Sequence, residues 1–179
     1  RSTLFPYTTL FRSLELEEDT MKVAVVMGSK SDESVVEKAV EVLHSFGVEV
    51  EWRIISAHRT PDIAHDFAKN AEAKGIEVII AAAGKAAHLA GVLAGVSPLP
   101  VIGLPMKSST MDGLDSLLSV VQMPSGIPVA TVAIGGAENA ALLAVQILSV
   151  KYPVLRERFK LYKEEMAKKI MALDEERRG

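Results

Sequence analysis

The sequence predicts a single α/β domain of three layers, an α/β/α sandwich in which helices cover both faces of a parallel sheet. Two observations support this prediction. After position 21, short β-branched runs alternate with stretches of helical periodicity, the rhythm of consecutive βα units with right-handed crossovers. Of the 179 residues, 49% are hydrophobic but only 5% are aromatic, so Ala, Val, Ile and Leu must fill the core, as in sheets covered on both faces.

The first part of the domain contains two expected strands with a helix between them. A β-branched run predicts a strand at 22–27. Apolar residues at helical spacing then predict a helix through 35–43, which Gly47 ends. A second β-branched run predicts the next strand at 48–54.

The rest of the domain repeats this alternation. Pro61 in the first turn and Gly75 at the end delimit a helix at 62–74. The continuous apolar run at 76–82 is typical of a buried parallel strand, and a Gly- and Ala-rich turn then leads into a short helix near 86–94. The remaining expected elements are a strand at 100–104, a helix at 112–121, a strand at 128–133 and a helix at 138–150.

Residues 1–20 differ from the rest of the chain. Thr3-Leu4-Phe5 recurs as Thr9-Leu10-Phe11, and no basic start precedes an apolar stretch, so the segment does not have the pattern of a signal peptide. Because it resembles translated sequencing adapter, we expect a non-native or disordered leader. The domain is therefore expected to span 21–152, with its natural start at Met21.

The last segment, 153–179, is expected to form a charged helix with a narrow apolar stripe. The residues of this stripe are spaced three or four positions apart: Leu155, Phe159, Tyr162, Met166, Ile170 and Leu173. Two interpretations stay open, because such a stripe can pack on the protein's own globule or on a neighbouring subunit.

Charge and composition exclude several classes of function. The net charge of −3 leaves no basic footprint for nucleic acid and no basic patch for a membrane surface. The chain has no cysteine, which excludes disulfides, thiolate catalysis and thiolate metal sites and is compatible with the expected cytoplasmic location. No apolar run reaches the roughly 18 residues that a membrane-spanning helix needs.

The turn from Gly28 to Asp32 follows the first strand, at the edge of the sheet where α/β proteins bind ligands. The hydroxyls of Ser29 and Ser31, with the free N–H groups of a helix start, suit a phosphate. The Asp32 carboxylate would repel phosphate and suits sugar hydroxyls instead. The alternative is that Ser31 or Asp32 only caps the helix. Neither the dinucleotide motif Gly-x-Gly-x-x-Gly nor a P-loop motif occurs.

The turn from Ser56 to Pro61 follows the second strand in the same way. His58 suits proton transfer, because histidine ordinarily titrates near neutrality. Arg59 offers a planar fork of donors for phosphate or carboxylate, and Ser56 adds a hydroxyl. The alternative is a structural histidine, the commoner role of a single histidine in a loop.

A third turn, 83–91, follows the third strand and is rich in glycine and alanine. Its small residues allow a ligand to approach closely, and its helix start offers N–H groups to an anion. His88 either contacts substrate or braces the loop, and metal binding by His58 and His88 lacks a third ligand nearby in sequence. The polar loop at 106–115 is expected to wall the site, with Asp112 as a helix cap.

These motifs resemble those of the PurE family of purine biosynthesis. The similarity covers about residues 22–152 and includes Gly-Ser-x-Ser-Asp, Ser-Ala-His-Arg-Thr-Pro, Ala-Ala-His-Leu and the run from Gly113 to Pro124. The resemblance implies a flavodoxin-like sandwich, a homo-octamer and a ribonucleotide substrate. The mutase branch of the family moves a carboxylate of N5-carboxyaminoimidazole ribonucleotide from the exocyclic nitrogen to ring carbon C4, without ATP, metal or organic cofactor.

The resemblance also implies a role for each polar residue of the first two turns. The phosphate would be bound by Ser29, Ser56 and Arg59, with Ser31 assisting. Asp32 would bind the ribose hydroxyls, which agrees with the preference of its carboxylate.

The resemblance to the PurE family also implies that His58 would be the general acid–base. The carboxylate or CO2 would lie against a turn that contains Gly84, Lys85, Ala86, His88 and Leu89. Lys85 departs from the mutase pattern, which usually has glycine there, and Ala90 stands where proline is usual. The sister branch, which carboxylates aminoimidazole ribonucleotide directly with CO2, has a basic residue at the first of these places and remains the alternative.

A further alternative is a non-catalytic protein that binds a phosphorylated sugar on the same scaffold. A phosphorylation-receiver domain is disfavoured, because it needs an aspartate at the end of the third strand. Ala81, Ala82 and Ala83 stand there instead.

Overall fold

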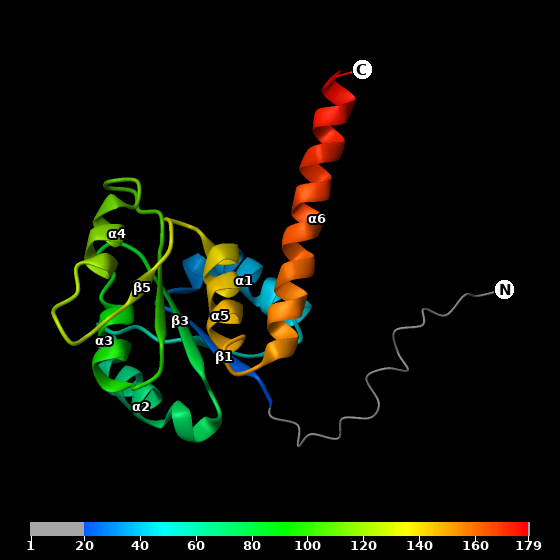
Figure 1. Ribbon diagram of the computed structural model, residues 1–179. Coiled ribbons are helices and arrows are strands. Elements are labelled where there is room, and N and C mark those ends of the chain that lie inside the picture. The colour runs from blue at the N-terminus through cyan, green and yellow to red at the C-terminus, as the bar shows by residue number, and fades with distance from the viewer. Residues whose placement is uncertain (1–19, 179) are drawn as a thin grey trace.

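The computed structural model describes residues 20–178 and contains a five-stranded parallel sheet (Figure 1). Its strand order, β2-β1-β3-β4-β5, is that of flavodoxin-like folds, which confirms the predicted fold class. The strands are β1 (Lys22–Met27), β2 (Glu49–Ile54), β3 (Val78–Ala83), β4 (Val101–Pro105) and β5 (Ala130–Thr131).

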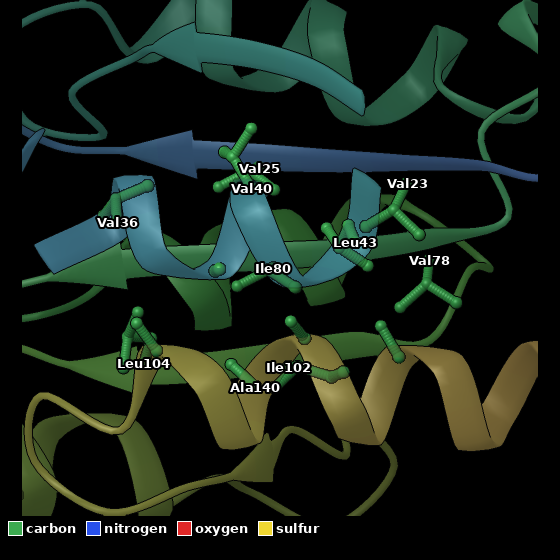
Figure 2. Close-up of a cluster of buried hydrophobic side chains, with 14 of the residues drawn as sticks. Val23, Val25, Val36, Val40, Leu43, Val78, Ile80, Ile102, Leu104 and Ala140 are labelled. Atoms are coloured by element: carbon green, nitrogen blue, oxygen red, sulfur yellow. The ribbon is translucent and has the colours of Figure 1, made fainter. Parts of the chain in front are cut away.

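Helices cover both faces of this sheet, so the predicted three layers are confirmed. One face packs against α1 (Glu33–Ser45) and α5 (Ala137–Leu148), which lie across β1, β3 and β4 in Figure 2. The other face packs against α2 (Pro61–Asn70), α3 (Leu89–Val96) and α4 (Leu114–Val121).

The central strands divide their side chains between these two helix layers. On β1, Val23, Val25 and Met27 point toward α1 and α5, whereas Ala24 and Val26 face the opposite layer. All five side chains are buried, which explains why the central strands appear in the sequence as continuous apolar runs rather than as alternating patterns.

Several predicted elements have different limits in the structure, including the following three. The helix expected at 62–74 ends at Asn70, because the chain tightens into the 3-10 turn η3 (Glu72–Lys74) and reverses at Gly75, with φ +76°. The strand expected at 128–133 pairs with β4 only through Ala130 and Thr131. The helix expected near 86–94 begins at Leu89, because the preceding turn contains a left-handed residue described below.

The C-terminal helix, α6 (Pro153–Arg178), projects from the globule (Figure 1). Its proximal half packs on the protein's own core, where Leu155 is fully buried and the rings of Phe159 and Tyr162 lie 6.3 and 5.8 Å from that of Phe46. Its distal half leaves Met166, Ile170 and Leu173 exposed. The apolar stripe therefore packs on its own globule over only part of its length.

The leader expected at 1–20 lies outside the described residues, apart from Thr20. Within the described part of the chain, no helix combines the length and the apolar character needed to cross a membrane.

Candidate active site

The loops that follow β1, β2, β3 and β4 meet at one edge of the sheet and line a cavity of about 470 Å³. The strand order reverses between β1 and β3, and the loops after both strands line this cavity, which is the usual ligand position in such sheets. The cavity is lined by every residue that the sequence singled out for the site: Ser29, Ser31, Asp32, Ser56, His58, Arg59, Gly84, Lys85, Ala86, His88 and Leu89.

The turn after β1 is held by its own hydroxyl groups. The Ser31 hydroxyl donates a 2.9 Å hydrogen bond to Ser29 Oγ, which also accepts one from the Ser31 N–H at 3.3 Å. Asp32 stands at the N-cap position of α1, but its carboxylate caps no backbone N–H and instead accepts a hydrogen bond from the Ser31 hydroxyl. Ser29 thus caps the short turn η2 (Lys30–Asp32), and the Asp32 carboxylate remains directed to the cavity that it lines.

Burial raises the pKa of the Asp32 carboxyl above its ordinary value, and the hydrogen bond from Ser31 opposes that change. The carboxyl is only half-buried, so it can still exchange hydrogen bonds with a ligand in the cavity.

Arg59 ties the turn after β2 to the turn after β1. Its Nη2 donates a 2.9 Å hydrogen bond to the Gly28 carbonyl, and its Nε donates one of 3.2 Å to Ser56 Oγ. The Thr60 hydroxyl donates to the Ser56 carbonyl and accepts from the Ser56 N–H. The guanidinium is therefore fixed between Gly28 of the β1 turn and the Ser56 hydroxyl, and it gives the cavity a cationic, donor-rich region.

The two histidines of the cavity contact each other. His58 Nε2 lies 2.9 Å from His88 Nδ1, and the rings meet edge to face at 76° with centroids 5.0 Å apart. One of these nitrogens must carry the hydrogen and the other accept it. His88 therefore both lines the cavity and contacts His58, a position that is consistent with each of the two roles left open by the sequence.

The loop after β4 walls the site as expected, although sequence reasoning assigned no individual residue of it. Lys107, Ser108 and Ser109 line the cavity. The Ser108 hydroxyl donates a 2.6 Å hydrogen bond to Asp115, which leaves Lys107 and Ser109 as the exposed polar groups of this wall. Their signal in the sequence is a polar turn directly after a buried strand, the same signal that identified the other three turns.

The expectation that Asp112 caps α4 is wrong. Gly113 occupies the N-cap position with φ +103°, and Asp112 itself has φ +58°. The Asp112 carboxylate instead forms a 2.9 Å ion pair with Lys107. Two successive left-handed residues turn the chain into α4, so the Asp112 side chain faces the loop rather than the N–H groups of the helix.

No group of three or more His, Asp or Glu side chains that could hold a metal ion occurs within residues 20–178. The arrangement combines a cationic, hydroxyl-lined end that suits phosphate with an imidazole pair that can move a proton. The turn from Gly84 to Leu89 adds a wall of small residues close to these imidazoles.

Comparison with known proteins agrees with this chemistry. A sequence model of the family described as AIR carboxylase matches residues 22–169. The chain belongs to the AIR carboxylase family. This match includes all four loops of the cavity and most of α6.

Individual members of the AIR carboxylase family are similar over most of the chain. A protein of Pyrococcus abyssi is 60% identical over 145 residues, covering 81% of this chain and 83% of its own length. A protein of Saccharolobus solfataricus is 56% identical over 151 residues, which cover 84% of this chain and 96% of the relative. Both are named N5-carboxyaminoimidazole ribonucleotide mutase. The crystal structure of Treponema denticola PurE matches with a TM-score of 0.80 at 35% identity, over 87% of this chain and 97% of that one.

Proposed function

We propose that this chain is a mutase that converts N5-carboxyaminoimidazole ribonucleotide to 4-carboxy-5-aminoimidazole ribonucleotide in purine biosynthesis. The observation that carries this proposal is that one cavity of about 470 Å³ contains both a group of hydroxyls and a guanidinium suited to phosphate and a pair of imidazoles in contact. The mutase name of relatives that are 56% and 60% identical supports the same reaction.

The ribonucleotide would lie with its phosphate beside the first two turns. Ser29, Ser56 and Arg59 bind the phosphate, and Ser31 assists through the hydroxyl that now contacts Ser29. The fixed guanidinium supports this role, because a fork held in place loses little side-chain entropy on binding an anion. Asp32 accepts hydrogen bonds from the ribose hydroxyls.

His58 acts as the general acid and then as the general base. The bond between the exocyclic nitrogen and the carboxyl carbon breaks, CO2 leaves, and His58 gives a proton to that nitrogen. Ring carbon C4 then forms a bond to the same CO2, and His58 takes the proton that C4 releases. His58 gives one proton and takes one back in each cycle, so the reaction consumes no net proton. It also needs no ATP. His88, in contact with His58, orients its ring.

Between the two steps, CO2 must stay beside the ring. Gly84, Ala86 and Leu89 would provide the wall against which it lies, because small and apolar side chains leave no competing hydrogen-bond partner there. The recaptured CO2 then reacts faster than one that diffuses in from solution, because it is already placed near C4.

We further propose a homo-octamer that functions in the cytoplasm. Exposed apolar side chains support an assembly, because α4 leaves Leu114, Leu118 and Val121 exposed on one stripe and α6 leaves its distal half without a partner in the described chain. Light scattering on dilute protein at neutral pH tests the assembly: a mass near that of eight chains is expected, and a stable monomer would contradict it.

Direct carboxylation of aminoimidazole ribonucleotide is the second candidate, because it yields the same 4-carboxy nucleotide and the Lys85 cation in the cavity wall would bind the carboxylate of that product. One assay separates the two reactions. Purified protein should consume N5-carboxyaminoimidazole ribonucleotide without added ATP or bicarbonate. Protein that turns over only aminoimidazole ribonucleotide with CO2 would instead be the carboxylase, and protein that binds the nucleotide without turnover would be a sensor.

A further inference from the structure

Lys85 has a backbone conformation that its residue type disfavours. Its φ of +58° lies in the left-handed region, which only Asp112 shares among the non-glycine residues of the described chain. A Cβ atom makes this backbone conformation less favourable than it would be for glycine. Such outliers are concentrated at ligand sites, so the lysine side chain itself is the feature to explain.

The turn around Lys85 is anchored at its far side. Ala87 and Leu89 are buried, and the His88 N–H donates a 2.9 Å hydrogen bond to the Ala86 carbonyl. Lys85 and Ala86 are left exposed, and both line the cavity. The fold therefore holds the Lys85 backbone in place and leaves its ammonium group to the cavity.

Three cations line the cavity, and two of them are already engaged. Arg59 donates to the Gly28 carbonyl and to Ser56, and Lys107 forms a 2.9 Å ion pair with Asp112. Lys85 makes no hydrogen bond or ion pair with any residue in the range 20–178. It is therefore the one of the three cations that has no partner among the described residues.

The topology places this cation and Arg59 in the loops of two strands that do not pair with each other. Arg59 follows β2 and Lys85 follows β3, and these strands flank β1 on its two sides. A ligand that binds across the end of β1 thus has one cation at each end. The substrate of the proposed reaction has this pattern of charge, with a phosphate at one end and a carboxylate at the other.

We propose that the Lys85 ammonium binds the carboxylate that the reaction moves, and that it thereby selects carboxylated ribonucleotides over aminoimidazole ribonucleotide. This inference rests on the proposed function and extends it to the recognition of one group. The carboxylate is present in the substrate and in the product, and it is absent from aminoimidazole ribonucleotide. Lys85 is thus a specificity residue whose effect appears in the ratio of two affinities.

Calorimetric titration with 4-carboxy-5-aminoimidazole ribonucleotide and with aminoimidazole ribonucleotide tests this assignment. Lys85→Met keeps an unbranched side chain only one atom shorter and removes its charge. It should weaken binding of the carboxylated nucleotide about fivefold, as for a partly exposed ion pair. Its affinity for aminoimidazole ribonucleotide should stay at the wild-type value. Lys85→Arg should preserve the ratio, and Lys38→Met, on the exposed face of α1, controls for the change in net charge.

A second variant separates charge from backbone strain. Lys85→Gly relieves the left-handed conformation, so it should raise the melting temperature and still lose the preference for the carboxylated nucleotide. An affinity ratio that stays at the wild-type value in Lys85→Met and Lys85→Gly would overturn the inference and leave the mutase assignment standing. Wild-type protein that binds neither nucleotide would overturn both.

Discussion

His58 and His88 share one hydrogen bond, with Nε2 of the first 2.9 Å from Nδ1 of the second. The two residues follow β2 and β3, which are separated by β1. Because one hydrogen serves both nitrogens, a proton gained or lost by one ring changes what the other can donate or accept. The imidazoles therefore act as a coupled pair.

Replacing His58 tests the catalytic role. His58→Asn removes the group that moves the proton but keeps a hydrogen-bonding side chain, so turnover should fall by at least about a hundredfold. Nucleotide affinity should change little, because the phosphate contacts remain. Steady-state kinetics and calorimetry measure the two effects, with His44→Asn on the exposed face of α1 as the control. Retained turnover would show that another group moves the proton.

Replacing His88 tests its action through His58. His88→Asn should lower kcat about fivefold, the effect of one lost hydrogen bond, and leave KM nearly unchanged. Because the partner of His58 Nε2 is altered, the pH–rate profile should also shift. A kcat loss without any displacement of that profile would assign His88 a purely structural role in the turn.

Arg59 should recognise phosphate through its fork rather than through its charge alone. Arg59→Lys keeps the charge but loses the planar donors, so affinity for the ribonucleotide should fall by at least about tenfold. Affinity for the nucleoside, which lacks the phosphate, should be unaffected. Calorimetry with both ligands measures the difference, and Arg177→Lys near the end of α6 is the matched control. Equal losses for both ligands would place the phosphate elsewhere.

Asp32 should make stability depend on pH. Because burial raises its pKa in the folded state, that state binds the proton more tightly than the unfolded chain does. The contribution of Asp32 to stability is thus fully present below the ordinary aspartate pKa and is lost as the pH rises through the raised pKa. Asp32→Asn cannot ionise, so it should be more stable than the wild type at neutral pH and equal to it in acid.

Denaturant titrations at the two pH values test this dependence on Asp32. The exposed Asp62, in the first turn of α2, provides the control variant Asp62→Asn, which should show no gain at neutral pH. A wild type as stable as Asp32→Asn at neutral pH would contradict the role assigned to burial.

The two halves of α6 should respond differently to truncation of an apolar side chain. Leu155 is fully buried, so Leu155→Ala should lower the free energy of unfolding by about 2 to 5 kcal/mol. Ile170 is 67% exposed, and Ile170→Ala should change the stability of the single chain by less than about 0.5 kcal/mol. Chemical denaturation at low protein concentration measures both. A large loss for Ile170→Ala there would show that the distal half packs within the same chain.

The layers and the four turns of the site were predictable, because each depends on local pattern. Buried strands such as 76–82 are continuous apolar runs, and the polar turn after each strand must lie at the same edge of a parallel sheet. Most differences at element ends come from turn conformations, such as the left-handed residues Lys85 and Gly113, which alter a helix start without changing the hydrophobic pattern.

The contacts between turns could not be predicted from pattern alone. The His58–His88 hydrogen bond depends on which strands flank β1, and the engagement of Arg59 with Gly28 depends on the same order. Both contacts are set by tertiary geometry that short-range periodicity does not encode. The ion pair between Lys107 and Asp112, by contrast, lies within one loop, where Asp112 and Gly113 both have positive φ.

The central claim, that one carboxyl group passes from nitrogen to carbon within a closed site, is tested most directly by tracing that group. Wild-type protein is supplied with N5-carboxyaminoimidazole ribonucleotide labelled with carbon-13 in the carboxyl group, in buffer that contains unlabelled bicarbonate. The account predicts that the label is recovered in the C4 carboxylate of the product. Label found in bicarbonate, with product carrying the unlabelled carbon, would contradict it.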